Sequence, residues 1–204
     1  MNLKVNEIFY SLQGEGRHTG KPAIFVRLSG CNMNCKFCDT DWVLGDQYTL
    51  EEILIQISDL PCKHIVWTGG EPLLQLNKES IQFFKKAGFT QSVETNGTLP
   101  IIKGLDYVAC SPKVGVDALN KNFKHYDVDE FRFVIGRINR KEYKPISIGQ
   151  LPLAIDYYVS PLFDGELHER LQADKDNIEK AVLFVKRNPK WKLSIQTHKL
   201  LGLQ

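Results

Sequence analysis

Three cysteines, Cys31, Cys35 and Cys38, stand at C-x3-C-x2-C spacing within one short stretch. They cannot all pair as disulfides, because one would be left over, but their thiolates can converge on one metal centre. A 4Fe–4S cube needs four corner ligands. Three cysteines without a nearby fourth would leave one iron open, and an open iron can bind a small molecule.

A zinc site is the alternative interpretation of the same triplet. Zinc also binds thiolates, but a closed structural site needs four ligands. Cys62 and Cys110 are distant in the sequence and lie in apolar runs, and His64 is a possible fourth ligand whose spacing does not demand that role. The triplet alone therefore favours an iron–sulfur cluster without excluding zinc.

A second stretch that could bind a ligand is the Gly-Gly-Glu-Pro turn at residues 69–72, which follows an apolar run. Two glycines after a strand expose backbone N–H and C=O groups to a bound molecule. The turn is not a phosphate-binding loop, because the G-x4-G-K-[ST] arrangement is absent.

Composition limits the class of protein. The 204 residues are 43% hydrophobic and 25% charged, with a formal net charge of +2. This is typical of one globular domain, here residues 1–204, and gives no reason to expect a nucleic-acid partner. No signal peptide or apolar run of membrane-spanning length is visible, and the odd number of cysteines predicts no disulfide framework. We therefore expect a cytoplasmic protein without a membrane partner, where thiolates persist.

The elements that position these residues alternate between strand and helix in the first half of the chain. Strands are predicted at 5–10, 23–28, 64–67, 92–95, 107–110, 131–135, 155–159 and 192–195. Helices are predicted at 50–57, 80–87 and 176–186, the first with a capping box formed by Thr49 and Glu52. Residues 114–130 and 137–152 show no helical periodicity. The pattern predicts an α/β fold, an incomplete barrel of about six core strands and three helices.

The cysteine spacing, with Phe37 before the last cysteine, and the Gly-Gly-Glu-Pro turn one βα unit later together resemble the radical S-adenosylmethionine (SAM) superfamily. The resemblance implies a partial TIM-like barrel. It also implies that the open iron of a 4Fe–4S cluster binds SAM, from which one electron releases a 5′-deoxyadenosyl radical that abstracts hydrogen from a substrate.

Further motifs narrow the resemblance. Residues 11–16 (SLQGEG), 25–28 (FVRL), 38–40 (CDT), 68–72 (TGGEP), 93–97 (VETNG), 111–113 (SPK) and 196–199 (QTHK) are together similar to the 7-carboxy-7-deazaguanine synthase family. The family converts 6-carboxy-5,6,7,8-tetrahydropterin into 7-carboxy-7-deazaguanine with release of ammonia, on the route to queuosine and related 7-deazapurines. The resemblance implies SAM, a 4Fe–4S cluster and Mg²⁺ as cofactors, a homodimer, and an electron donor such as flavodoxin or ferredoxin.

The resemblance also implies roles for individual residues, with no conventional acid–base dyad. Cys31, Cys35 and Cys38 would ligate the cluster, and Thr40 would bind Mg²⁺ through its hydroxyl, which suits a cation that prefers oxygen. SAM would be held by Phe37, Cys38, Asp39, Gly70, Ser111, Pro112 and Lys113. The pterin would be framed by Leu12, Gln13, Gly14, Arg27, Thr68 and Gln204, with Arg27 on its carboxylate.

Two positions depart from the family pattern. Gln204 stands where the family often ends in a proline whose carboxylate approaches the substrate, and Ser160 stands where a glutamine often precedes the proline now at Pro161. Two rival functions are a glycyl-radical-activating enzyme, which would need a protein partner, and a non-enzymatic zinc or iron–sulfur binding module. The segments 11–16 and 38–40 argue against the activating enzyme.

Overall fold

The computed structural model describes residues 1–38, 40–124, 128–138, 141–163 and 175–203. One curved sheet of ten strands organises them, with the strand order β10-β9-β7-β6-β5-β4-β2-β1-β3, and with β8 paired to β7. The bounds of the strands are β1 (Asn2–Leu12), β2 (Pro22–Leu28), β3 (Asp46–Thr49), β4 (His64–Gly69), β5 (Thr90–Thr95), β6 (Tyr107–Cys110), β7 (Val128–Ile138), β8 (Lys141–Tyr143), β9 (Ala154–Pro161) and β10 (Lys192–Leu193).

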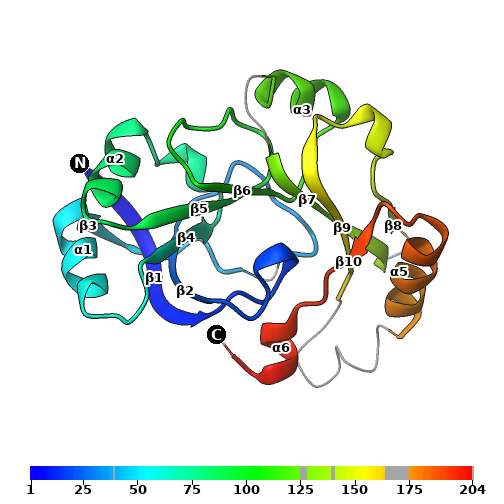
Figure 1. Ribbon diagram of the computed structural model, residues 1–204, viewed down its shortest axis with the longest axis horizontal. Helices are drawn as coiled ribbons and strands as arrows, with labels where there is room; N and C mark the ends of the chain where they lie inside the picture. The colour runs from blue at the N-terminus through cyan, green and yellow to red at the C-terminus, as the bar shows by residue number, and fades with distance from the viewer. Residues whose placement is uncertain (39, 125–127, 139–140, 164–174, 204) are drawn as a thin grey trace.

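The strands from β2 to β10 along this path run parallel, whereas β1 pairs antiparallel with both β2 and β3. Helices connect several of these parallel strands and cover the convex outer face of the sheet (Figure 1). They are α1 (Leu50–Ser58), α2 (Lys78–Lys86), α3 (Val116–Asn122) and α5 (Lys175–Arg187), and α6 (Thr197–Leu201) follows the last strand. The predicted partial barrel is confirmed.

Helices α1 and α2 were expected from the sequence pattern, and α3 was not. The capping box of α1 is present, because the Glu52 N–H donates to Thr49 Oγ1 at 3.2 Å and the Thr49 N–H donates to Glu52 Oε2 at 2.7 Å. Helix α2 begins at Lys78 with Asn77 as its N-cap, two residues before the predicted start. Helix α3 lies in a stretch for which no helix was expected, because only Leu119 of its seven residues is buried.

The main core lies between the sheet and the outer helices. On β2, Ile24, Val26 and Leu28 belong to this core, so the alternating residues Phe25 and Arg27 face the inside of the barrel. A second, smaller cluster of Ala23, Phe25 and Val66, with Phe9 against it, lies on that inner face. The sheet is therefore apolar toward its helices, and its inner face is free to carry other chemistry.

The open side of the barrel is crossed by the segment that follows β1, which includes the short 3-10 helix η1 (Gly16–His18). The N–H of Gly16 donates to Ser194 Oγ at 3.0 Å, and the N–H of Arg17 donates to Glu130 Oε2 at 2.9 Å. Figure 1 shows this segment between β2 and the strands β9 and β10. Side-chain and backbone hydrogen bonds thus join the two ends of the curved sheet.

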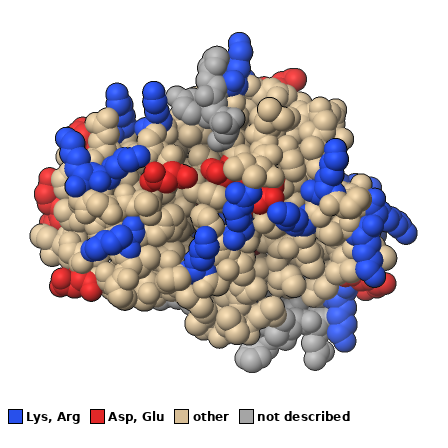
Figure 2. Space-filling view, in the orientation of Figure 1, with Lys and Arg blue, Asp and Glu red and all other residues tan. Residues whose placement is uncertain are grey.

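No helix in the described ranges combines the length and the apolar character needed to span a membrane. Lysine and arginine side chains are spread among acidic ones on the face shown in Figure 2. This distribution agrees with the small net charge of +2.

Candidate functional site

Polar side chains gather on the inner face of the barrel because the strands alternate. On β7, Phe131 and Phe133 pack in the outer core, and Arg132 between them points inward. The same alternation places polar residues inward on the neighbouring strands: Arg27 on β2, Thr68 on β4, Glu94 on β5 and Ser160 on β9. Because the helices bury the outer face of the sheet, the polar side chains of these strands lie on its inner face.

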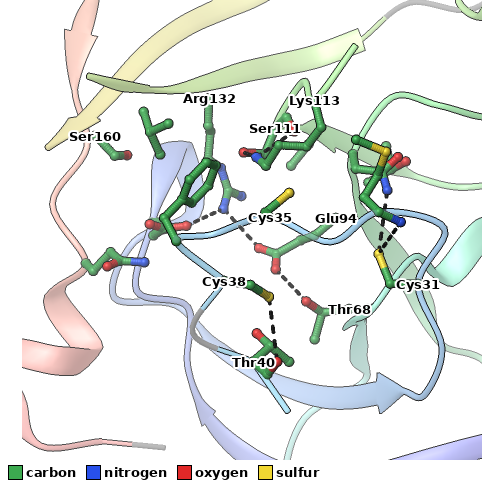
Figure 3. Close-up of a pocket in the computed structure, with 18 of the residues that line it drawn as sticks. Cys31, Cys35, Cys38, Thr40, Thr68, Glu94, Ser111, Lys113, Arg132 and Ser160 are labelled. Carbon is green, nitrogen blue, oxygen red and sulfur yellow. Dashed lines mark hydrogen bonds and ion pairs between the residues drawn. The ribbon is translucent and has the colours of Figure 1, made fainter. Parts of the chain in front are cut away.

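The cysteine loop follows β2 at the carboxyl edge of the sheet. This loop forms part of the wall of a cavity of about 240 Å³, which is lined by Cys31, Cys35 and Cys38 (Figure 3). The Met33 N–H donates to Cys31 Sγ at 3.4 Å, and Cys38 Sγ donates to the Thr40 carbonyl at 3.6 Å. Within the described ranges, no three His, Cys, Asp or Glu side chains are arranged to hold a metal ion. The thiols line the cavity without forming a ready-made metal site.

The potential fourth ligands of a zinc site lie elsewhere. His64 is the first residue of β4, so about 16 Å of strand, at about 3.3 Å per residue, separates it from the carboxyl edge. Cys62 donates to the carbonyl of Pro22, the first residue of β2, and so also lies at the amino edge. Cys110 is fully buried in the outer core. None of these three residues can complete the cysteine triplet in this fold.

The Gly-Gly-Glu-Pro turn holds the cysteine loop in place. The Gly70 N–H donates to the Leu28 carbonyl at 3.0 Å, and the Glu71 N–H donates to the Gly30 carbonyl at 2.9 Å. A Cβ on Gly70 would lie 1.8 Å from that same Gly30 carbonyl oxygen, so glycine is required there. The predicted ligand contact, Gly70, lines the cavity and also supports its wall.

Glu71 is fully buried and accepts hydrogen bonds from the next strand's turn. Its carboxylate receives the Asn96 N–H at 2.7 Å and the Thr95 hydroxyl at 2.9 Å, as well as the Leu73 N–H at 3.1 Å. Burial raises the pKa of Glu71, and these donors oppose that effect. Glu71 therefore ties the ends of β4 and β5 together beneath the cavity.

Ser111 and Lys113 reach the cavity from the end of β6, whereas Pro112 between them is half-buried and does not line it. The Lys113 ammonium donates to Ser111 Oγ at 2.8 Å and lies 5.4 Å from the ring centroid of Phe37. Burial lowers the pKa of Lys113. Burial also raises the pKa of the Cys35 thiol, and the positive charge of Lys113 opposes this rise. Ser111, Lys113 and Phe37 therefore share one partly buried wall of the cavity.

A second cavity of about 500 Å³ adjoins the first. Its lining includes every described residue that was predicted to frame a substrate: Leu12, Gln13, Gly14, Arg27 and Thr68. Six residues line both cavities, namely Glu15, Thr40, Thr68, Glu94, Gln196 and Lys199. Molecules in the two cavities would therefore be neighbours, with Thr40 at their boundary.

Arg27 faces the second cavity and pairs with Glu7 of β1 through its Nε at 2.5 Å. Its guanidinium carbon also lies 5.5 Å from the centroid of the Phe9 ring. The alternation of β2, with Val26 and Leu28 in the outer core, places this arginine inward. It is a guanidinium in the wall of a cavity, held by one carboxylate and one ring.

Glu94 stands where the two cavities meet. Its carboxylate accepts from Thr68 Oγ1 at 2.9 Å, from Arg132 Nη1 at 2.9 Å and from Gln13 Nε2 at 3.1 Å. Burial acts to raise the pKa of Glu94, but Arg132 and the hydrogen bonds outweigh it, so the net effect is a lowered pKa. The ionised carboxylate is the stable form here.

Sequence reasoning missed Glu15, Arg132, Gln196 and Lys199 as lining residues. Arg132 had a signal, because an arginine between two phenylalanines in a helix-covered strand must face inward. Glu15, Gln196 and Lys199 lie in motifs that were recognised without a role being assigned to each position. Asp39 and Gln204, predicted to contact SAM and substrate, lie outside the described residues.

The donor set fits a cluster with SAM. Three thiols line one cavity, and neither of the other cysteines can join them. The hydroxyl of Ser160, which is 7% exposed, has no hydrogen-bond partner among the described residues, yet Ser160 lines the same cavity. A buried polar atom without a partner costs free energy, and a polar ligand in the cavity would supply one.

Comparison with known proteins gives consistent results. The family model described as "Radical SAM superfamily" matches residues 25–151. The chain is 40% identical over 204 residues to 7-carboxy-7-deazaguanine synthase from Bacteroides thetaiotaomicron, with complete coverage of both chains. It is 32% identical to the protein of that name from Burkholderia multivorans, again with complete coverage, and 35% identical to that from Haemophilus influenzae, covering 95% of the relative.

The fold has a solved counterpart. The crystal structure of QueE from Escherichia coli superposes with a TM-score of 0.71, covering 96% of this chain and 94% of the other at 22% identity. At this identity the likeness supports the fold alone.

Proposed function

The chain belongs to the 7-carboxy-7-deazaguanine synthase family of the radical SAM superfamily, and from that premise we propose how its two cavities divide the reaction. The reaction is the radical SAM ring contraction of 6-carboxy-5,6,7,8-tetrahydropterin to 7-carboxy-7-deazaguanine, with release of ammonia, in 7-deazapurine and queuosine biosynthesis. The cavity with the cysteines holds the cofactors, and the adjoining cavity holds the pterin. One observation carries this division. Phe37, Cys38, Gly70, Ser111 and Lys113 line only the first cavity, whereas Leu12, Gln13, Gly14 and Arg27 line only the second, and the two cavities share a boundary.

Cys31, Cys35 and Cys38 would hold three corners of a 4Fe–4S cluster, leaving the fourth iron for SAM. When bound, the cluster and SAM supply the radical that abstracts hydrogen from the substrate. The chain itself supplies position and protection from water. Glu71 and Gly70 fix the loops around the cofactors, and Lys113, Ser111 and Phe37 form the wall against which SAM would lie.

The pterin would be held by one positively charged side chain and several polar groups. Arg27 would bind its carboxylate as a planar guanidinium can, in exchange for or beside Glu7. Leu12, Gln13 and Gly14 line the same cavity, and Thr68 stands at the boundary with the cofactors. Asp39 and Gln204 keep their proposed contacts with SAM and substrate on the family resemblance alone.

Thr40, which lines both cavities, would bind Mg²⁺ through its hydroxyl. A hydroxyl together with substrate oxygens and water suits this cation, which keeps much of its own hydration shell. There it would orient the substrate and stabilise charge on its oxygens during nitrogen migration.

The proposed enzyme needs partners that its chemistry defines. A one-electron donor such as flavodoxin or ferredoxin reduces the cluster, and two copies of the chain form a homodimer. We propose a reducing, cytoplasmic setting, where the thiolates that would hold the cluster persist.

Anaerobic turnover tests the proposal. Protein reconstituted with iron and sulfide is incubated with SAM, Mg²⁺, a reductant and 6-carboxy-5,6,7,8-tetrahydropterin, and the products are separated by mass-resolved chromatography. We expect 7-carboxy-7-deazaguanine and ammonia. Cleavage of SAM without formation of a deazaguanine would agree with radical SAM chemistry but contradict the proposed substrate. One zinc per chain without labile sulfide would contradict both the chemistry and the substrate.

A further inference from the structure

Arg132 is the centre of the largest ion-pair network inside the described part of the barrel. Its Nη1 donates to Glu94 Oε1 at 2.9 Å and to Glu15 Oε2 at 3.1 Å, and its Nε donates to Glu130 Oε1. Figure 3 shows Arg132 reaching toward Glu94. The arginine comes from β7, Glu94 from β5 and Glu15 from the segment after β1, so one side chain joins three parts of the fold.

The two halves of this network differ in where they lie. Glu130 is fully buried and also accepts from the Tyr107 hydroxyl at 2.8 Å and the Arg17 N–H at 2.9 Å, away from both cavities. Glu15 and Glu94 line both cavities. Arg132 is therefore anchored through Nε on a buried carboxylate and presents Nη1 to the two carboxylates at the boundary.

Arginine suits this task better than lysine. Its planar fork points donors in fixed directions, so Nε and Nη1 can engage different carboxylates at once. Burial acts to lower the pKa of Arg132, but the carboxylates outweigh burial and raise it, so the guanidinium stays charged at any working pH. A lysine would keep the charge and lose the fixed directions.

We propose that Arg132 is a positioning residue for the reaction, acting through Glu15 and Glu94 to hold the boundary between the cofactor and substrate cavities in one geometry. The inference rests on the proposed function, since that function gives the two cavities their occupants. Without the guanidinium, the two carboxylates repel each other and turn toward solvent. The substrate then loses its fixed place beside the cofactor.

Arg132→Lys and Arg132→Gln test this role. Arg132→Gln is also combined with Glu130→Gln, so that the fully buried Glu130 is not left charged without its ion-pair partner. We expect Arg132→Lys to raise KM for the pterin about tenfold with kcat changed less than threefold, and the double variant to raise KM about a hundredfold. Iron and sulfide content should stay within about twofold of the unaltered protein, because the ion pairs of Arg132 are with carboxylates and not with the three cysteines. Equilibrium binding of the pterin to the cluster-loaded protein, measured without turnover, should weaken in parallel.

Arg17 offers a matched control. It is also an arginine paired with a buried carboxylate of the barrel, Asp156, through Nε at 2.6 Å, but it lines neither cavity. Arg17→Lys should lower the melting temperature and leave KM within about twofold.

The outcomes separate the possible failures. If the unaltered protein makes no deazaguanine, the proposed function fails. If it does so and Arg132→Lys folds with unchanged KM, or Arg17→Lys raises KM as much as Arg132→Lys, the positioning role is overturned. Arg132→Lys keeps the buried charge and is the variant expected to fold, so its KM decides the question even if the glutamine variants do not fold.

Discussion

Gly70 packs so closely against Gly30 that a single added carbon would lie 1.8 Å from the Gly30 carbonyl oxygen. The same oxygen accepts the Glu71 N–H at 2.9 Å, so the turn after β4 and the start of the cysteine loop are joined by contact and by a hydrogen bond. The position of the cysteines therefore depends on a turn almost forty residues further along the chain.

Gly70→Ala should separate these two segments. The neighbour of the new methyl group is backbone and cannot rotate away, so we expect a loss of more than about 2 kcal/mol in the free energy of unfolding and a large loss of bound iron and sulfide. Thermal melting and metal analysis measure both. Gly115→Ala is the control, because its Cβ would meet no atom within 4 Å. Equal iron content in the two variants would contradict the role given to Gly70.

Cys35→Ala should abolish the bound cluster and SAM cleavage, because two thiolates cannot replace three at the corners of the cube. Iron, labile sulfide and 5′-deoxyadenosine are the quantities to measure after anaerobic reconstitution. Cys62→Ala is the matched variant: that half-buried thiol lies at the amino edge and should be dispensable for both. A cluster retained in Cys35→Ala and lost in Cys62→Ala would mean that the ligand set has been misidentified.

Thr40→Ala should weaken the response of turnover to Mg²⁺ while leaving the cluster intact. Removing one oxygen ligand makes the cation depend on substrate and water, so the Mg²⁺ concentration for half-maximal activity should rise about tenfold. Titration of activity with Mg²⁺ gives this value, and iron analysis checks the cluster. Thr19→Ala, whose exposed hydroxyl donates to the Gly16 carbonyl, serves for comparison. An unchanged titration in Thr40→Ala would remove this residue from the metal site.

Asp156 links stability to pH. It is 6% exposed and accepts from Arg17 and Lys192; burial acts to raise its pKa, but these two cations lower it overall. A carboxyl with a lowered folded-state pKa stabilises the protein above its unfolded value of about 3.9 and loses that contribution as the pH falls. Asp156→Asn should therefore cost roughly 1–3 kcal/mol at pH 7, and the difference should shrink below about pH 4.

Melting temperatures between pH 3 and pH 7 test this linkage. Glu142, in an exposed pair with Lys144, provides the surface control, and Glu142→Gln should change the melting temperature little at any pH. A difference between Asp156→Asn and the unaltered protein that stays constant across this range would refute the linkage.

Local patterns were enough to predict much of the fold and part of the site. Periodicity located the core strands and the three longer helices, and Thr49 with Glu52 marked a helix start that the structure reproduces. The short helix α3 was missed because one buried residue, Leu119, gives no periodic signal. The strand β3 was not expected either, since it is defined by its pairing with the start of β1.

Long-range partners were beyond the reach of local patterns. The pairing of Arg132 with Glu15 joins residues 117 positions apart, and nothing near either residue specifies the other. The sequence showed Arg27 as a charge within an apolar run, but only the alternation of β2 against a helix-covered core decided that it points inward. Side-chain direction in this barrel follows from which face the helices cover.

The contacts between the two ends of the described chain bear on when the enzyme can mature. Gly14 accepts from both the N–H and the hydroxyl of Thr197, at 3.0 Å each, and Gly16 donates to Ser194. A chain still on the ribosome with β9 just made already carries all three cysteines, but it lacks the segment that closes the cavity beside them. At that moment the cavity would lack Gln196 and Lys199 from its wall and would be open to water on their side.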